Sequence, residues 1–279
     1  MAVRIVTDST SDITADLASE LGITVIPLTV FFGRSSFLDR VEMSTDEFYR
    51  RLAQESLFPT TTQPTPAAFS EAYSEILEAG DDIVAIVISS KLSGTFQSAS
   101  SAVGIAGDES RIRVIDSLNT AMGLGLLVIA AAKLARTGVD LDHVASFVDE
   151  RLAKSHVIML FDSLKYLARG GRIGRAQGLL GSVLSIKPIL TVKDGVVHPL
   201  TRLRSIAAGR EYLYNFAHSF SRIEGLAVED ATTPEIADSL ARRLGDDYPD
   251  NYIYRSTVSP VLGTYMGPNV LSVSVLEEL

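Results

Sequence analysis

A short polar segment, Ser89-Ser90-Lys91-Leu92-Ser93-Gly94-Thr95, stands between a strand-like run and a helix-like run. In open α/β sheets, ligands bind outside the carboxyl ends of the strands. The start of the following helix adds unpaired N–H groups and the positive end of the helix dipole, which favour an anion. Gly94 allows close approach of the backbone, and Ser93 offers a hydroxyl donor. The segment is a candidate anion site, although Ser93 or Thr95 acting as an ordinary helix cap explains it equally well.

A second candidate is the proline-flanked segment Pro59-Thr60-Thr61-Thr62-Gln63-Pro64. The prolines hold the backbone extended, so the threonine hydroxyls point outward. Taken alone, the segment is better explained as a loop before a helix that begins at Thr65-Pro66, with Thr65 as its cap.

Two carboxylates four residues apart, Asp8 and Asp12, lie in a polar stretch after the first predicted strand. Such a pair can bind a cation or act as acid and base. No Asp, Glu or His cluster elsewhere in the sequence completes a metal shell. We therefore expect no metal, and we expect these residues to hydrogen-bond their own loop, with Asp12 capping the next helix.

Three arginines, Arg169, Arg172 and Arg175, alternate with glycines within seven residues of an otherwise acidic chain. Glycines beside an arginine leave its guanidinium free to present a fork to carboxylate or phosphate. Lys187 and Arg202 extend this positive segment. A solvated basic loop is the alternative, and the local density of arginines favours a functional patch.

Nucleophilic catalysis finds no support in the sequence. Ser93 would need a general base, and the four histidines fall inside predicted helices or strands: His143, His156, His198 and His218. The sequence contains neither a nucleophile elbow nor a Walker phosphate-binding pattern. We therefore predict no catalytic residue.

Composition excludes several classes of protein. The chain has 279 residues, 25 Lys+Arg against 34 Asp+Glu, and no cysteine, so it is acidic and cannot form disulfides or thiolate metal sites. The net charge of −9 argues against nucleic-acid binding. Mean hydropathy is high at +0.22. Even so, the longest apolar run, 121–132, is much shorter than the roughly 20 residues that a bilayer span needs. We expect a cytoplasmic protein without stable membrane insertion.

The elements that must position these residues alternate between strand and helix in the first half. Apolar runs predict strands at 3–7, 24–32, 83–88 and 111–115, and periodicity predicts helices at 13–21, 119–137 and 141–153. Ser44 and Glu47 form a capping-box pattern for another helix. This alternation predicts βαβ units and a mostly parallel sheet flanked by helices.

The second half of the chain shows a different pattern of predicted strands and helices. Strands at 186–192 and 196–203, joined through Asp194-Gly195, predict a hairpin. Helices near 205–222 and 234–244 then alternate with strands near 225–229, 252–257 and 270–275. The predicted fold class is α/β with two domains: an N-terminal α/β domain of residues 1–160 and a C-terminal α+β domain of residues 161–279.

Considered together, these motifs resemble the DegV family of bacterial fatty-acid-binding proteins over essentially the whole chain. The matching segments, in order, are Thr7–Asp12, Thr61-Thr62-Gln63-Pro64, Ser89–Ala99, Leu167–Gly174, Ile186–Leu190 and Gly267-Pro268. The resemblance implies one long-chain fatty acid, such as palmitate, stearate or oleate, in a lipid tunnel between the two domains, with no other cofactor. The apolar runs 121–132 and 179–189 are then candidates to line the tunnel.

The resemblance also implies which residues bind the carboxylate. It assigns this role to Thr61 and Ser93, with Thr62 and Gly94 beside them. Tyr265 stands two residues before Gly267-Pro268, where the family commonly has histidine. A tyrosine can donate a hydrogen bond there but stays neutral near pH 7.

The function implied is that of a carrier and not of an enzyme. On this interpretation a separate fatty-acid kinase catalytic subunit phosphorylates the bound acid, and Arg169, Arg172 and Arg202 face that partner or its phosphate. Two alternatives remain open at this point: an enzyme that acts on a phosphorylated small molecule, and a lipid sensor without a kinase partner.

Overall fold

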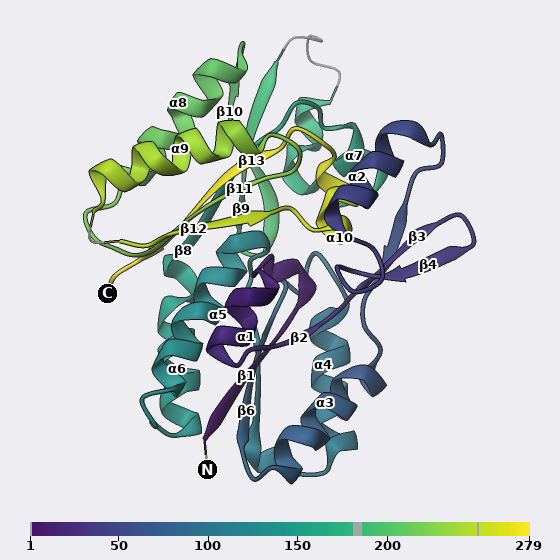
Figure 1. Ribbon diagram of the computed structural model, residues 1–279, viewed down its shortest axis with the longest axis vertical. Helices are drawn as coiled ribbons and strands as arrows, with labels where there is room; N and C mark the ends of the chain where they lie inside the picture. The colour runs from purple at the N-terminus through teal and green to yellow at the C-terminus, as the bar shows by residue number, and fades with distance from the viewer. Residues whose placement is uncertain (1, 181–185, 250) are drawn as a thin grey trace.

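The computed structural model describes residues 2–180, 186–249 and 251–279. Its first half contains the predicted parallel sheet, with strand order β2-β1-β6-β7 (Figure 1). These strands are Val3–Asp8 (β1), Thr24–Ile26 (β2), Asp82–Val87 (β6) and Ile112–Asp116 (β7). All three pairings are parallel. β6 is buried along almost its whole length because helices cover both faces of the sheet.

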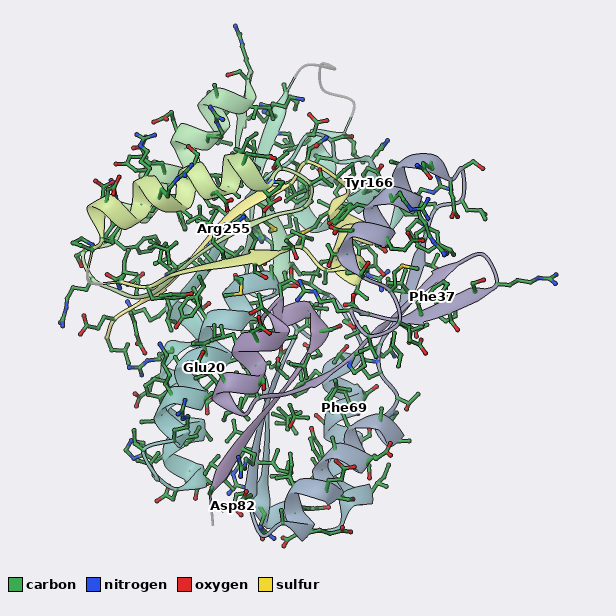
Figure 2. All side chains as sticks on the ribbon, in the orientation of Figure 1. Glu20, Phe37, Phe69, Asp82, Tyr166 and Arg255 are labelled. Carbon is green, nitrogen blue, oxygen red and sulfur yellow. The ribbon has the colours of Figure 1, made fainter. Side chains whose placement is uncertain are left out.

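The two faces of this sheet bury separate apolar clusters. Helices α3 (Pro66–Glu78) and α4 (Thr95–Ala106) pack Phe69 and Tyr73 against one face; Figure 2 labels Phe69 beside these helices. Helices α1 (Ala15–Leu21), α5 (Ala121–Ala135) and α6 (Leu141–Arg151) cover the other face. The predicted strand–helix alternation is therefore confirmed in this half of the chain.

The predicted strand at 24–32 is divided between two sheets. It stops as β2 at Ile26 and resumes as β3 (Thr29–Phe32) in a small antiparallel sheet of order β4-β3-β5, with β4 at Ser35–Leu38 and β5 at Thr60–Thr62. Pro27, which has no N–H to donate to a ladder, lies at the break. The β3–β4 hairpin projects from the body of the molecule (Figure 1), and β5 brings the threonine segment back beside it.

Two helix caps in the structure differ in detail from the predicted ones. Ser44 accepts a hydrogen bond from the Glu47 N–H of α2 (Thr45–Gln54), as predicted. The Glu47 carboxylate, however, pairs with Arg50 and Arg51 at 2.7 and 2.6 Å. In α1 the N-cap is Thr14. The prediction that Asp12 caps this helix is wrong, because Asp12 is buried elsewhere.

The second half forms a six-stranded sheet of order β10-β9-β8-β13-β11-β12, in which only β11 and β12 pair in parallel. Its strands are Ser155–Leu160 (β8), Lys187–Lys193 (β9), Val196–Leu203 (β10), Ile223–Asp230 (β11), Ile253–Thr257 (β12) and Leu271–Glu277 (β13). Helices α8 (Ile206–Ala217) and α9 (Pro234–Asp247) cover one face (Figure 1). The predicted β9–β10 hairpin is confirmed, and its turn residues Asp194 and Gly195 both have positive φ.

Strand β8 bears on the predicted domain limits. It pairs with β9 and β13, so residues 155–160 belong to the second sheet although they precede residue 161. The limits 1–160 and 161–279 remain a prediction. We propose that a division drawn by sheets falls before Ser155.

Helix α5 lies between the two sheets (Figure 1) and contacts β1 of the first and β8, β11 and β13 of the second. This placement explains its almost uniformly apolar sequence, because neighbours bury twelve of its fifteen residues. A Cβ on Gly125 would lie 2.5 Å from the Ser11 carbonyl oxygen, which shows how closely α5 approaches that loop. No described helix is long and apolar enough to cross a membrane.

Two short helices, α7 (Lys165–Arg169) and α10 (Pro260–Met266), pack on each other at the inner face of the second sheet. The described 3₁₀ turns are Ser9–Ser11 (η1), Glu109–Arg111 (η2), Leu152–Lys154 (η3) and Gly174–Leu179 (η4). Alternate residues of β8 point to opposite faces of the second sheet. Ile158 points toward α8 and α9, whereas Met159 packs in a cluster with α2, α10 and β3. Within this second cluster the structure leaves a cavity.

Candidate functional site

The cavity lies at the carboxyl end of β6 and is lined by residues from both halves of the chain. The space within its lining is about 660 Å³, a figure that includes solvent at the open mouth. Most of its lining is apolar: Leu28, Ile88, Leu92, Met159, Phe161, Leu167, Val197, Val261, Leu262 and Met266. The polar side chains of the lining are Thr10, Thr61, Gln63, Ser93, Thr120, Arg172 and Tyr265.

Thr61 and Tyr265 form the most direct polar contact of this lining. The Thr61 Oγ1 and Tyr265 Oη atoms are 2.6 Å apart, and either can donate. Thr61 is half-buried in β5, while its neighbours Thr60 and Thr62 are exposed, as the alternation of a strand requires. The structure therefore brings Thr61 to the cavity and does not bring Thr62 there.

Ser93 lies in the loop between β6 and α4. Its Oγ accepts a hydrogen bond from the Thr95 N–H at 3.3 Å and lies 2.9 Å from the Thr95 hydroxyl. The N-cap residue of α4 is Gly94, so neither Ser93 nor Thr95 occupies that position. Ser93 nevertheless accepts the N–H of Thr95, the first residue of the helix, so the alternative that Ser93 helps to cap α4 holds in part. Ser93 lines the cavity beside this helix start.

Gly94 has a packing role. A Cβ at this position would lie 2.8 Å from the Gln63 Nε2 atom, so glycine lets the Gln63 side chain pack against the start of α4. Gly94 itself does not line the cavity, whereas Gln63 does. Gln63 was not among the predicted site residues. Its spacing of two from Thr61 in an extended segment was the available signal, since alternate residues share a face.

The predicted arginines occupy three different environments. Arg172 lines the cavity: its Nε donates to the Leu92 carbonyl at 3.3 Å, and its guanidinium lies 5.0 Å from the Tyr265 ring centroid. Arg169 lies over the Phe58 ring at 4.4 Å, in a surface hollow beside the mouth that also contains Arg172. Arg202 is exposed on β10 and lines neither space.

Two close contacts hold the mouth together. A Cβ on Gly170 would lie 2.3 Å from Cδ1 of Tyr265, and one on Gly267 would lie 2.3 Å from Cδ2 of Tyr166. Tyr166, labelled in Figure 2, also stacks on Phe58 with ring centroids 5.5 Å apart. The glycine-rich segment and α10 are thus packed directly on each other, which fixes the Tyr265 ring beside Thr61 and Arg172.

The predicted tunnel-lining runs fall elsewhere. Residues 121–132 do not line the cavity, since α5 fills the space between the sheets. For the run 179–189, residues 181–185 lie outside the described part of the chain. Of its described residues, Leu179 packs at the edge of the cluster that surrounds the cavity, and Ile189 packs on the opposite face of the second sheet.

A group of buried carboxyl groups lies behind the cavity. Asp8 accepts hydrogen bonds from the Thr10 and Ile88 N–H groups at 3.0 and 2.8 Å, so it holds its own loop as predicted. Asp12 accepts from the Ser259 N–H and Arg40, and Glu229 accepts from the Met122 N–H and Ser272. Burial raises the pKa of all three carboxyl groups. Among the described residues, no three His, Asp or Glu side chains are placed to hold a metal ion.

Asp39, in the same region, makes stability depend on pH. Burial raises its pKa to about 7, against a hydrogen bond from Ser9 and the charge of Arg40. An unfolded aspartate titrates near 3.9, so the native state binds this proton more tightly. The stabilisation is complete below about pH 4 and is lost as the pH rises through about 7. We expect the Tm to fall between about pH 4 and pH 7, and Asp39→Asn to flatten that fall.

Thermal unfolding across this pH range measures the effect. Asp246→Asn, at an exposed carboxylate on α9, is the matched control and should leave the slope unchanged. An Asp39→Asn protein whose Tm falls as steeply as that of the wild type would show that this carboxyl group is not the source.

Comparison with known proteins identifies the family. The profile of the family described as "Uncharacterised protein, DegV family" matches residues 2–278. A DegV domain-containing protein of Caldanaerobacter subterraneus subsp. tengcongensis is 38% identical over 276 residues, covering 97% of each chain. The chain belongs to the DegV family.

Solved structures of similar proteins agree in fold over the full length. A DegV family protein from Thermus thermophilus, described as binding fatty acid, has a TM-score of 0.92 at 31% identity, with 100% of both chains covered. DegV from Bacillus subtilis, described as a fatty-acid-binding protein, has a TM-score of 0.88 at 29% identity, again with 100% of both chains covered. The predicted fold class, a helix-flanked parallel sheet with a second sheet-rich domain, is confirmed.

Proposed function

We propose that this protein binds one long-chain fatty acid in the cavity, with the acyl chain among the apolar side chains and the carboxylate at Thr61, Ser93 and Tyr265. The observation that carries the proposal is a mostly apolar cavity whose mouth gathers hydroxyl donors and one arginine. The fatty-acid binding described for the T. thermophilus and B. subtilis relatives supports it. Palmitate, stearate and oleate are the proposed ligands.

The energetics of such binding are favourable. Burying a C16 chain contributes roughly 0.8 kcal/mol per methylene, or about 11 kcal/mol before the costs of ordering are subtracted. Several kcal/mol of lost entropy still leave affinity in the submicromolar range. The carboxylate must keep hydrogen-bonding partners, because an unpaired buried charge is expensive. Hydroxyl groups and the Arg172 guanidinium can provide them at the mouth.

Displacement of a fluorescent fatty acid tests the proposal. Stearate should displace the probe with a stoichiometry of one per chain, and octyl phosphate should not compete at the same concentration. Failure of every long-chain acid to bind, together with protection of the protein by a small phosphorylated metabolite, would contradict it. That result would favour an enzyme that acts on a phosphorylated small molecule.

We further propose that the protein is a cytoplasmic carrier that presents the carboxylate to a fatty-acid kinase catalytic subunit, which forms the acyl phosphate. The carboxylate would lie at the open mouth, beside the exposed guanidiniums of Arg169 and Arg172. Arg169 stacks on Phe58 outside the cavity, where it can contact a partner without contacting the acyl chain. Catalysis is assigned to the partner subunit.

Arg169→Ala is expected to leave fatty-acid affinity unchanged within about twofold and to lower partner-dependent phosphorylation about tenfold. The reason is that loss of one charge-assisted contact costs roughly 1.5–3 kcal/mol, and this side chain lies beside the mouth and not in it. Acyl-phosphate formation with the kinase subunit of the same organism is the measurement. Arg210→Ala, at an exposed arginine on α8, is the control. Equal phosphorylation by the two variants would remove Arg169 from the partner surface. The expected result is a loss of phosphorylation in Arg169→Ala alone, with fatty-acid binding unimpaired in both variants.

A further inference from the structure

Thr120 is an unusual member of the cavity wall. It is 3% exposed, and its side chain lines the same cavity as Thr61 and Tyr265. Its Oγ1 atom is buried and has no hydrogen-bond partner. Among the described residues, Thr120 alone combines a place in this lining with a buried, unpartnered side-chain oxygen. The wall of the cavity therefore contains a hydroxyl that the folded chain leaves unsatisfied, although this oxygen is itself buried within the wall.

The hydroxyl is unpartnered because other groups perform its usual task. Thr120 is the N-cap residue of α5, a position where threonine normally bonds the N–H groups of the first turn. Here the Glu229 carboxylate accepts from the Met122 N–H at 3.2 Å, and Asn119 Oδ1 accepts from the Thr120 N–H at 3.0 Å. Helix α5 is thus capped from β11, and the Thr120 hydroxyl is left without a role in capping.

A threonine at this site is costly unless something pairs with it. Valine has nearly the same shape and no polar atom, and a buried hydroxyl without a partner destabilises the folded state. Most other polar groups of the lining are engaged: Thr61 with Tyr265, Ser93 with Thr95, Thr10 with Asp8, and Arg172 with the Leu92 and Gly170 carbonyls. Gln63 is exposed and can be satisfied by solvent. Thr120 can both donate and accept, and rotation about its Cα–Cβ bond is what would turn the hydroxyl toward a ligand in the cavity.

We propose that the cavity selects a long-chain fatty acid with a hydroxyl group part-way along its chain, and that Thr120 hydrogen-bonds this hydroxyl. The inference rests on the proposed function and specifies its ligand class. In an apolar cavity a mid-chain hydroxyl without a partner would weaken binding, because it must leave water. Thr120 gives it a partner, and Thr10, whose oxygen can still accept, lines the same space.

The test is a positional series of ligands against a set of variants. Stearate and its 3-, 10- and 12-hydroxy derivatives are titrated as competitors of a fluorescent fatty acid. For the wild-type protein, one hydroxy acid should bind at least as tightly as stearate. Thr120→Val should weaken that hydroxy acid about tenfold relative to stearate, since it removes the partner and keeps the shape. Thr120→Ser, which keeps the hydroxyl, should retain the preference.

Thr7→Val is the matched control. Thr7 also has a buried, unpartnered hydroxyl, but it lies in β1 and does not line the cavity, so this variant should leave the ratio of affinities unchanged. If every hydroxy acid binds more weakly than stearate and Thr120→Val leaves the ratios unchanged, the inference is overturned while the proposed function stands. Failure of stearate itself to bind the wild-type protein would instead overturn the proposed function.

Discussion

Replacing both Ser93 and Thr61 by alanine is expected to lower fatty-acid affinity at least about 100-fold. Each hydroxyl is proposed to donate to the carboxylate, and a hydrogen bond to a charged group contributes roughly 1.5–3 kcal/mol. Loss of two such bonds therefore costs about 3–6 kcal/mol, which exceeds a hundredfold change in Kd. The Thr61 change also removes the 2.6 Å contact that positions the Tyr265 hydroxyl. Fluorescent fatty-acid displacement measures the loss.

A matched pair of substitutions separates this effect from damage to the fold. Ser90 and Thr62 are exposed, lie within three residues of the two site residues, and do not line the cavity. The Ser90→Ala, Thr62→Ala protein should therefore bind with the affinity of the wild type. Equal affinities for the two double variants would place the carboxylate somewhere other than the mouth described here.

Reversing the charge at Arg172 is expected to weaken fatty-acid binding about 10- to 100-fold. Arg172 is the cationic side chain of the described cavity lining, and the Leu92 and Gly170 carbonyls hold its guanidinium at the mouth. Glutamate would replace attraction of the carboxylate by repulsion and would also lose the contact with the Tyr265 ring. The exposure of Arg172 moderates the effect, because water and salt screen it.

The salt dependence of binding provides a second readout for this variant. Attraction between Arg172 and a carboxylate should make wild-type affinity fall as ionic strength rises, and Arg172→Glu should reverse that trend. Arg175→Glu makes the same charge change three residues along the chain, at an exposed residue outside the cavity lining. If both variants lose affinity equally, the cause is the overall charge of the segment and not a contact with the ligand.

The parts of the fold that were predictable are those set by local pattern. The apolar, β-branched run that became β6 indicates a strand buried on both faces, and the Asp194-Gly195 turn indicates a hairpin. Within the candidate site, the resemblance to the DegV family named Thr61, Ser93 and Tyr265, and these three residues lie together at the cavity. Each of these features depends mainly on neighbours in sequence or on a motif of fixed spacing.

The features that were missed depend on contacts between distant segments. Residues 24–32 are one apolar run, and only the packing of β3 against β5 assigns its second part to another sheet. Helix α5 has the sequence of a ligand-lining segment, yet it is buried between two sheets. The free hydroxyl of Thr120 depends on Glu229, which is 109 residues away in sequence and caps α5 in its place.

Native mass spectrometry of the freshly purified protein tests the central claim most directly. The proposed function predicts an adduct with the mass of one long-chain fatty acid per chain, which is released on denaturation and diminished in the Ser93→Ala, Thr61→Ala protein. Identification of the released lipid would also show whether its chain carries a hydroxyl. A protein that carries no such adduct and takes up no added fatty acid would contradict the claim.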